Sequence, residues 1–298
     1  MSAQPETANK QTRPFYWSVR RELWENRSLY LAPLIVAGVI VFGFMFSAIG
    51  LAERRKAVLL LDDPLKTRTA IEMPYSMAAM MIMFTAFIVA VFYCLDALHG
   101  ERRERSILFW KSLPVSDFTT VLSKAVVAFV IIPAITFAVV IVTDLMIFLI
   151  TSIVLLVHGM SPATTLTHTH YFLNVVLFLY GIVVLTIWHV PTYSWMLLVS
   201  GWARRAAFLW AILPWVAIVF FERITFGTYY FYSFIKYRFG SPATTAFNFP
   251  DPKHPCLDSL SQLTLGRYLT TPGVWIGLAF GIVFLAIAIR MRRYRAPM

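Results

Sequence analysis

Six long apolar runs constrain the fold of this chain more than any other feature. They cover residues 31–51, 74–98, 121–157, 171–200, 206–221 and 273–289. A helix needs about 20 apolar residues to cross the hydrocarbon core of a bilayer, so runs of this kind are typical of membrane spans. The chain is 59% hydrophobic and 14% charged, whereas soluble domains carry about 25% charged residues. We therefore predict an all-α membrane protein, with one transmembrane domain over residues 1–298 that contains six transmembrane helices.

The distribution of basic residues predicts the orientation in the membrane. An even number of spans places both termini on one side, and the tails and loops of that side hold 16 of the 26 Lys and Arg residues. The positive-inside rule then places both termini in the cytoplasm, although Arg54, Arg55 and Lys56 fall on the opposite side. Because the basic residues flank the apolar runs and form no basic face, we expect contacts with membrane lipids and no binding of nucleic acid.

The run at residues 121–157 is too long for a simple crossing. As a helix it would extend about 55 Å, almost twice the thickness of the hydrocarbon core. We predict one long helix that projects past the outer face, with Asp144 near the outer boundary. A break at Asp144, followed by a re-entrant segment, is the alternative.

Residues 12–30, before the first run, have the pattern of an amphipathic helix. Phe15, Val19 and Leu23 recur at four-residue spacing, which indicates a helix lying along the cytoplasmic membrane interface. The charged residues are expected on another face: Arg20, Arg21, Glu22 and Glu25. A solvated tail that only fixes the topology is the alternative.

Two further segments have recognisable patterns. The outer segment 222–272 begins with aromatic residues broken by charges and continues into a proline-rich loop, so we expect it to lie at the outer interface, either as an anchor or as a gate. In the last run, Gly273, Gly277 and Gly281 repeat every four residues. Such a face allows close helix packing, either within the chain or between two copies.

The sequence contains no complete catalytic motif. Gly38 and Gly43 have the spacing of a phosphate-binding loop, but Phe44 and Met45 stand where Lys and Ser or Thr are required. His168 and His170 lack further ligands nearby, so a polar loop explains them better than a metal site. Asp144 and His189 are the candidate residues of a transport pathway, because ionisable groups within membrane spans commonly mark one. For His189, hydrogen-bonded packing is the alternative.

Between the second and third runs, residues 101–117 read ERRERSILFWKSLPVSD. Acidic residues at the start and Lys111 near the end favour a short helix, and Pro114 helps to end it. Ser116 then predicts an N-cap, with Asp117 in the first turn of the helix that enters the third run. The apolar residues among the charges suit either lipid headgroups or a groove on a cytoplasmic partner.

The stretch ERRERSILFWKSLPVSDFTTVLSK resembles the first cytoplasmic loop of type-2 ABC exporter permeases, in which a charged helix, a Leu-Pro-Val-Ser break and a lysine lead into the third span. The six-span layout, the N-terminal amphipathic helix and the long last outer loop are similar across nearly the whole chain. In that family the loop is a coupling helix that docks in a cleft of a separate ATPase subunit. The resemblance therefore implies a coupling helix over residues 101–114. Its interface residues would be Glu101, Arg102, Arg103, Glu104, Arg105, Ile107, Leu108, Phe109, Trp110, Lys111, Leu113 and Pro114, with Arg204 and Arg205 as a second contact.

The resemblance also implies partners and a location. Two ABC ATPase subunits would bind ATP and Mg, and this chain would hold no cofactor and catalyse no reaction. A second permease, identical or related, would complete the path in the cytoplasmic (inner) membrane of a bacterium. The few fixed charges in the spans favour amphipathic cargo such as a lipid, peptide or antibiotic. An ion-coupled secondary carrier and a membrane-embedded sensor or enzyme remain the alternatives.

Overall fold

The computed structural model describes residues 13–61, 63–103, 116–168, 170–248 and 259–294. In this part of the chain the regular structure is helical, apart from one isolated bridge between Phe247 and Leu263. The described residues include six helices that are long and apolar enough to cross a membrane. The predicted all-α, multi-pass architecture is therefore confirmed.

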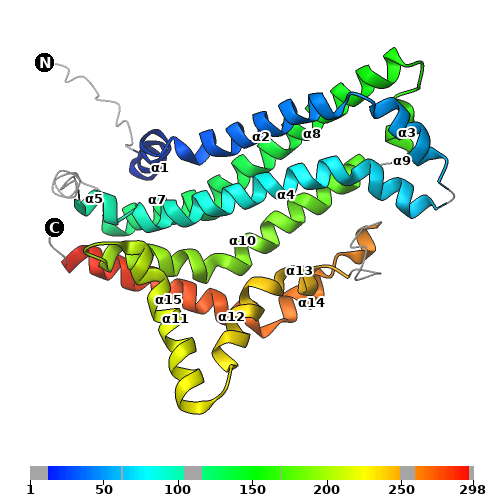
Figure 1. Ribbon diagram of the computed structural model, residues 1–298. Coiled ribbons are helices and arrows are strands. Elements are labelled where there is room, and N and C mark those ends of the chain that lie inside the picture. The colour runs from blue at the N-terminus through cyan, green and yellow to red at the C-terminus, as the bar shows by residue number, and fades with distance from the viewer. Residues whose placement is uncertain (1–12, 62, 104–115, 169, 249–258, 295–298) are drawn as a thin grey trace, which may run out of the picture.

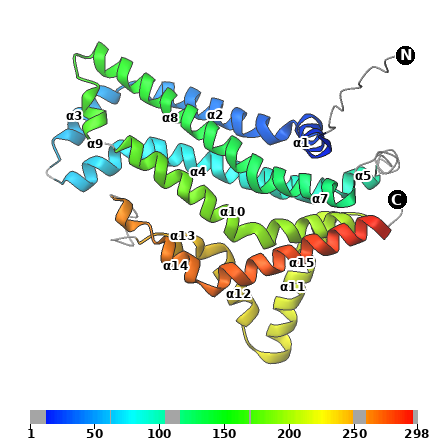
Figure 2. The ribbon, with the colours of Figure 1, turned by 180° about the vertical axis from the view of Figure 1, so that it is seen from behind.

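The long helices form a bundle in which most of them lie side by side (Figures 1 and 2). They are α2 (Ser28–Ser47), α4 (Pro64–Asp96), α7 (Asp117–Val126), which continues through the π-helical turn η1 (Val127–Ile131) into α8 (Ile132–Val157), α10 (Tyr171–Trp202), α11 (Ala207–Phe226) and α15 (Pro272–Tyr294). The shorter elements are α1 (Pro14–Glu25), α3 (Leu51–Leu59), α5 (His99–Arg103), α9 (Ala163–His168), α12 (Tyr230–Gly240), α13 (Pro242–Ala246), η2 (Leu260–Gln262) and α14 (Leu265–Thr270). Helices α1, α5 and α7 and the last turns of α15 lie at one end of the bundle, which we call the terminal end; α3 and α9 lie at the other, the far end (Figure 1).

Small residues at four-residue spacing allow the central helices to pack closely. On α4 the residues at positions 78, 86 and 90 are alanines, and they are buried together with Ile82 and Cys94 on one face. On α8, Thr136 and Thr143 are also buried, and each hydroxyl donates to a carbonyl one turn earlier, Ile132 at 2.8 Å and Val139 at 2.7 Å. These bonds satisfy the hydroxyl groups locally, so threonine can occupy an apolar interface.

The third long helix runs without a break through Asp144, which excludes the predicted alternative of a re-entrant segment after that residue. The irregularity lies earlier, in the π-helical turn at Val127–Ile131, just before Pro133. Proline lacks an N–H group and crowds the carbonyl one turn before it, and a wider turn relieves that conflict.

Helix boundaries differ from the edges of the apolar runs because caps and turns end a helix, whereas hydropathy does not. The first run was predicted to reach residue 51, but α2 ends at Ser47 and Gly50 turns the chain with φ of 76°. The second helix begins at Pro64, ten residues before its apolar run, because Asp63 caps it by accepting the backbone N–H groups of Leu65 and Lys66.

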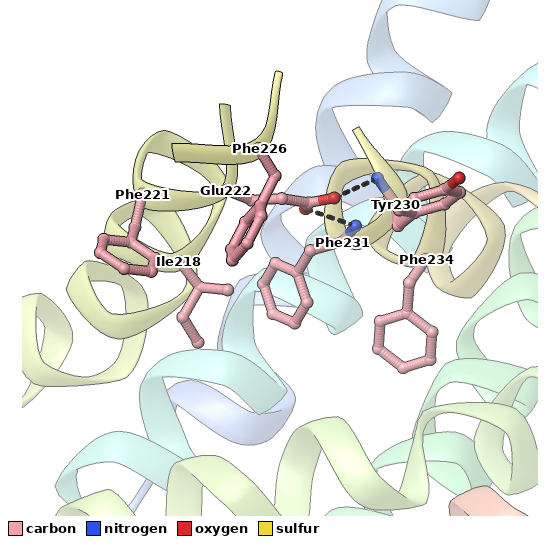
Figure 3. Close-up of a pocket in the computed structure, with 7 residues that line it drawn as sticks. All are labelled: Ile218, Phe221, Glu222, Phe226, Tyr230, Phe231 and Phe234. Atoms are coloured by element: carbon pink, nitrogen blue, oxygen red, sulfur yellow. Dashed lines mark hydrogen bonds between the residues drawn. The ribbon is translucent and has the colours of Figure 1, made fainter. Parts of the chain in front are cut away.

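Helix α11 leaves the bundle and is joined to α12 by a sharp turn (Figure 1). Glu222 holds this turn: its carboxylate accepts from the backbone N–H groups of Tyr230 at 2.6 Å and Phe231 at 2.8 Å (Figure 3). It thereby caps the N-terminus of α12. Aromatic and aliphatic side chains beside Glu222 line a hollow of about 460 Å³: Ile218, Phe221, Phe226, Tyr230, Phe231 and Phe234.

Candidate functional site

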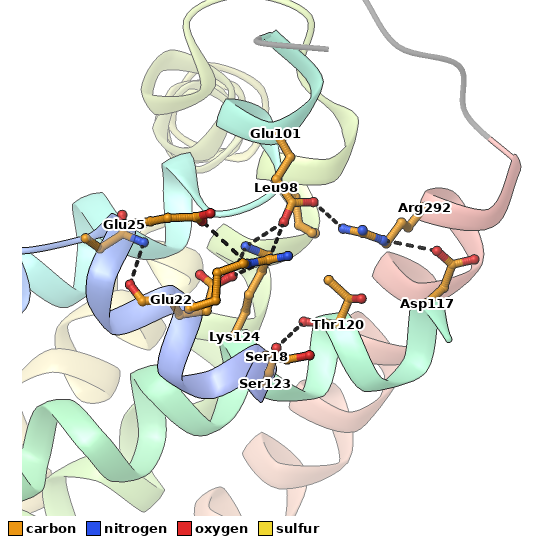
Figure 4. A network of polar contacts seen from close by, with 12 residues as sticks. Ser18, Glu22, Glu25, Leu98, Glu101, Asp117, Thr120, Ser123, Lys124 and Arg292 are labelled. Atoms are coloured by element: carbon orange, nitrogen blue, oxygen red, sulfur yellow. Dashed lines mark hydrogen bonds and ion pairs between the residues drawn. The ribbon is translucent and has the colours of Figure 1, made fainter. Parts of the chain in front are cut away.

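Charged side chains from four helices meet at the terminal end of the bundle (Figure 4). Helix α1 contributes Arg21 and Glu22, α5 contributes Glu101, α7 contributes Asp117 and Lys124, and α15 contributes Arg292. Three cations thus face three carboxylates. We call these six residues the terminal cluster. The exposed carboxylate of Glu25 lies 3.5 Å from Arg21 Nε at the edge of the group.

Glu22 and Lys124 form its most buried pair. Lys124 Nζ lies 2.8 Å from Glu22 Oε1 and 3.1 Å from Glu101 Oε1. The side chains of Lys124 and Glu22 are only 2% and 1% exposed. Glu22 also accepts a hydrogen bond of 3.0 Å from the Tyr93 hydroxyl on α4. Lys and Glu are almost never buried to this degree without partners, so the pair depends on the packing of α1 against α7.

Glu101 connects the remaining cations. In addition to Lys124, Arg21 Nη2 lies 3.0 Å from Glu101 Oε1, and Arg292 Nη1 donates to Glu101 Oε2. Arg292 Nε also binds Asp117 Oδ1 at 3.1 Å. One arginine of α15 therefore holds both Glu101, just before residues 104–115, and Asp117, just after them.

The start of α7 is formed as predicted. The Ser116 hydroxyl accepts the backbone N–H of Thr119 at 3.1 Å, and Asp117 lies in the first turn. The predicted N-cap is therefore confirmed. This cap fixes the position at which Asp117 meets Arg292.

The facing carboxylates stabilise the charged form of Arg21. Burial by itself would lower the pKa of Arg21, but the adjacent carboxylates of Glu22 and Glu101 outweigh it and raise the pKa above its ordinary value. Breaking one buried pair of such a network leaves an uncompensated charge and is strongly unfavourable. The terminal cluster thus fixes the relative positions of α1, α5, α7 and α15.

A second set of bonds ties α5 to the C-terminal end of α10. The buried Ser200 hydroxyl accepts from the backbone N–H groups of Leu98 at 2.8 Å and His99 at 2.9 Å. Arg102 Nη1 donates to the carbonyl groups of Gly201 at 2.8 Å and Ala203 at 3.3 Å. The chain entering residues 104–115 is therefore fixed to α10 as well as to the terminal cluster.

These contacts bury some of the predicted docking residues, whereas others are exposed. Glu101 and Arg102 were predicted to face an ATPase, but both side chains are buried in contacts within the chain. Arg103 is exposed, as are Arg204 and Arg205 in the turn beside the contacts of Arg102. The other predicted docking residues lie outside the described residues: Glu104, Arg105, Ile107, Leu108, Phe109, Trp110, Lys111, Leu113 and Pro114.

Helix α1 follows the predicted amphipathic pattern only in part. Val19 and Leu23 pack against the core of the bundle, but Glu22, expected among the exposed charges, is completely buried. The prediction was wrong for Glu22 because its partner Lys124 lies more than a hundred residues later in the chain.

The glycine face of α15 packs within the chain. A Cβ atom at Gly277 would lie 2.6 Å from the Arg238 guanidinium, and one at Gly281 would lie 2.6 Å from Val190; at Gly273 it would meet the Tyr237 hydroxyl at the same distance. The Arg238 guanidinium fills the space beside Gly277, donates to the carbonyl groups of Trp188 and Gly273, and stacks 4.8 Å from the centre of the Trp188 ring. The glycines therefore admit side chains of α10 and α12.

The two predicted pathway residues lie in different surroundings. His189 is buried among aromatic rings, 5.7 Å from that of Phe87 and 5.9 Å from that of Phe239, and its Nδ1 lies 2.9 Å from the Leu185 carbonyl. This matches the packing alternative. Asp144 instead lines a cavity to which His189 does not contribute.

Sequence reasoning missed the terminal cluster, although one signal was present. Lys124 lies on the same helical face as Val121, Ala125 and Ala128, all of which are buried. A single charge within an apolar stripe indicates a buried partner. Nothing in the local pattern identifies that partner as Glu22.

Within the described ranges, no group of three or more His, Cys, Asp and Glu side chains is arranged to hold a metal ion. No known family model, no curated protein and no solved structure matches this chain. The arrangement that the structure adds to the sequence is a buried ionic network on both sides of residues 104–115, tied to four helices of an apolar bundle.

Proposed function

We propose that the chain is the permease subunit of an ATP-driven exporter of the type-2 ABC kind, and that a separate ATPase subunit docks on the segment 101–114 through residues other than the buried Glu101 and Arg102. One observation supports this most directly. Arg292 holds Glu101 and Asp117, so both ends of the docking segment are anchored to the same arginine. A force on the segment would therefore move the helices to which Glu101 and Asp117 are anchored.

The contacts at the terminal end suit such coupling. Lys124 and Arg21 pass a displacement of Glu101 to α7 and α1, and Arg102 passes it to the C-terminal end of α10. Buried ion pairs resist separation, so these helices would move together as a rigid body. Movement of the bundle against a second permease, identical or related, would open and close the path for amphipathic cargo.

Helix α1 would lie at the cytoplasmic interface of the membrane. Tyr16, Trp17 and Trp24 are exposed, and the Arg20 guanidinium lies 5.3 Å from the Trp17 ring and 4.5 Å from the Trp24 ring. Exposed aromatic rings beside a basic residue are typical of the headgroup region. Both termini would then be cytoplasmic, in the inner membrane of a bacterium.

The test is a double substitution, Leu108→Ala with Trp110→Ala. Truncation of a central interface residue commonly costs about 2 kcal/mol or more, so the ATPase subunit should no longer copurify from native membranes. ATP hydrolysis by the complex in lipid should fall with it. Insertion should be normal, because neither residue lies in an apolar run.

A matched control removes the same two side-chain types at exposed positions of the terminal end, Trp24→Ala with Leu31→Ala. This variant should keep the ATPase subunit. Full retention of the ATPase and of hydrolysis by the Leu108→Ala, Trp110→Ala variant would refute the docking assignment and the proposed function.

A further inference from the structure

A second polar region lies in the half of the bundle nearest the far end. There, α4, α8 and α10 line a half-open cavity of about 580 Å³, and Ala243 and Phe247 contribute to its wall. Cavities that bind small molecules commonly measure about 300–1,000 Å³. This one is separate from the terminal cluster and shares no residue with it.

The wall of the cavity is mainly apolar and includes Met73, Met80 and Met83 of α4. Methionine side chains are flexible and polarisable, so they adapt to ligands of different shape. The polar lining residues are Thr69, Glu72, Tyr75, Ser76, Asp144, Tyr171 and Asn174. Two of them carry acidic groups, and no lysine or arginine is among the described residues that line the cavity.

The two acidic groups differ in their partners. Glu72 is neutralised by Arg68, whose Nε lies 3.0 Å from Glu72 Oε1, and it accepts from Asn174 Nδ2 at 3.1 Å. Asp144, in contrast, has neither a salt bridge nor a hydrogen bond to any residue that the structure describes, and its Oδ1 is buried. The buried hydroxyl of Tyr171, which also lines the cavity, is equally unpaired within the described ranges.

An unpaired carboxylate with a buried oxygen is costly, because that oxygen has lost water without gaining a hydrogen bond or a counter-charge. A ligand cation beside Asp144 would supply that charge, and the faces of the tyrosine rings would attract it further. The methionine-rich wall would hold an apolar body attached to the cation.

We infer that this cavity binds an amphipathic cation, with its charge beside Asp144 and Tyr171 and its apolar part against the methionines of α4. Binding is a property of this chain alone. The use of the cavity as a cargo site, however, rests on the proposed export function.

The experiment measures equilibrium binding of radiolabelled tetraphenylphosphonium, a bulky apolar cation, to the purified chain in lipid nanodiscs. Empty nanodiscs and excess unlabelled cation define the saturable binding. Asp144→Asn should weaken this binding about tenfold or more, as expected for loss of a charged partner. The matched control Asp96→Asn removes the same charge from an exposed carboxylate at the terminal end, and it should bind the cation as the unchanged chain does.

Two further measurements separate binding from folding. Radiolabelled tetraphenylborate, similar in size and opposite in charge, should show no saturable binding when it is measured in a separate sample. Asp144→Asn should be at least as stable to heat as the unchanged chain without ligand, because it removes an unpaired buried charge. The inference is overturned by absence of saturable binding, by equal binding to Asp144→Asn, or by a fall in stability that reveals a structural partner of Asp144. Loss of ATPase docking would leave this result unaffected, and failure of cation binding would leave the docking test unaffected.

Discussion

Replacing Lys124 by methionine tests whether the terminal cluster holds the bundle together. Methionine is about as long as the apolar stem of lysine, so the substitution removes one positive charge with little change in side-chain length. Glu22 would retain Arg21 at 2.8 Å and the Tyr93 hydroxyl, and Glu101 would retain Arg21 and Arg292. Three carboxylates would then face two cations. Breaking a buried ion pair in this way costs about 3–5 kcal/mol.

The assay is thermal unfolding of the purified chain in detergent. At about 2–4 °C per kcal/mol for a chain of this order of size, Lys124→Met should lower Tm by about 6–20 °C. The matched control is Lys66→Met, which removes the same charge from an exposed pair in which Lys66 Nζ lies 3.4 Å from Asp63 Oδ2. Exposed pairs contribute about 0–1 kcal/mol, so the control should shift Tm by a few degrees at most.

A double-mutant cycle separates the ion pair from the packing of the lysine stem. Glu22→Gln together with Lys124→Met restores the balance of charge, and the amide oxygen introduced by Glu22→Gln can still accept from the Tyr93 hydroxyl. The double variant should be more stable than the sum of the two single changes by about 0.5–3 kcal/mol. Strict additivity, or a Tm shift for Lys124→Met no larger than that for Lys66→Met, would refute the argument that the terminal cluster fixes these helices.

Two further predictions concern the glycine face and the topology. Gly277→Leu should displace the Arg238 guanidinium and cost about 1–3 kcal/mol by thermal unfolding, whereas Gly43→Leu, at a position with no atom within 4 Å of the added Cβ, should be neutral; equal effects would contradict packing of α15 by Arg238. In a Cys256→Ser background, cysteines at Ser2 and Ala296 should react with membrane-impermeant reagents only after the inner membrane is opened, and one at Ala243 should react in intact cells once the outer membrane is permeable. Labelling of the two termini on opposite sides would exclude six spans.

The spans were predictable because each is a local property of the sequence. About 20 consecutive apolar residues need no tertiary information to identify them, and Ser116 marks the start of α7 through an N-cap that depends on its immediate neighbours. The end of α2 and the start of α4 were less predictable, since Gly50 stands inside the first apolar run and Asp63 lies well before the second. Local chemistry sets these boundaries, but hydropathy does not report it.

Pairing between distant charges could not be predicted in the same way. The partner of Glu72 can be read from its spacing, since Arg68 lies one turn earlier on the same helix. The partner of Glu22 cannot, because Lys124 is brought to it by the packing of α1 against α7. Periodicity indicated that Glu22 was exposed, and the long-range pair overrode that pattern.

For Asp144, the sequence alone could not predict whether a partner is absent. One turn away on either side stand Val140 and Phe148, so the sequence excludes a local counter-ion but cannot exclude one on a neighbouring helix. The packing of α4 and α10 against α8 brings Tyr171 and Glu72 to the same cavity, and Glu72 is already paired with Arg68. The described residues that line this cavity include no lysine or arginine. The unpaired state of Asp144 is thus a property of three packed helices. The sequence of α8 alone does not show whether this carboxylate is neutralised by a neighbouring helix. The inferred cation site therefore rests on the fold and not on the local sequence.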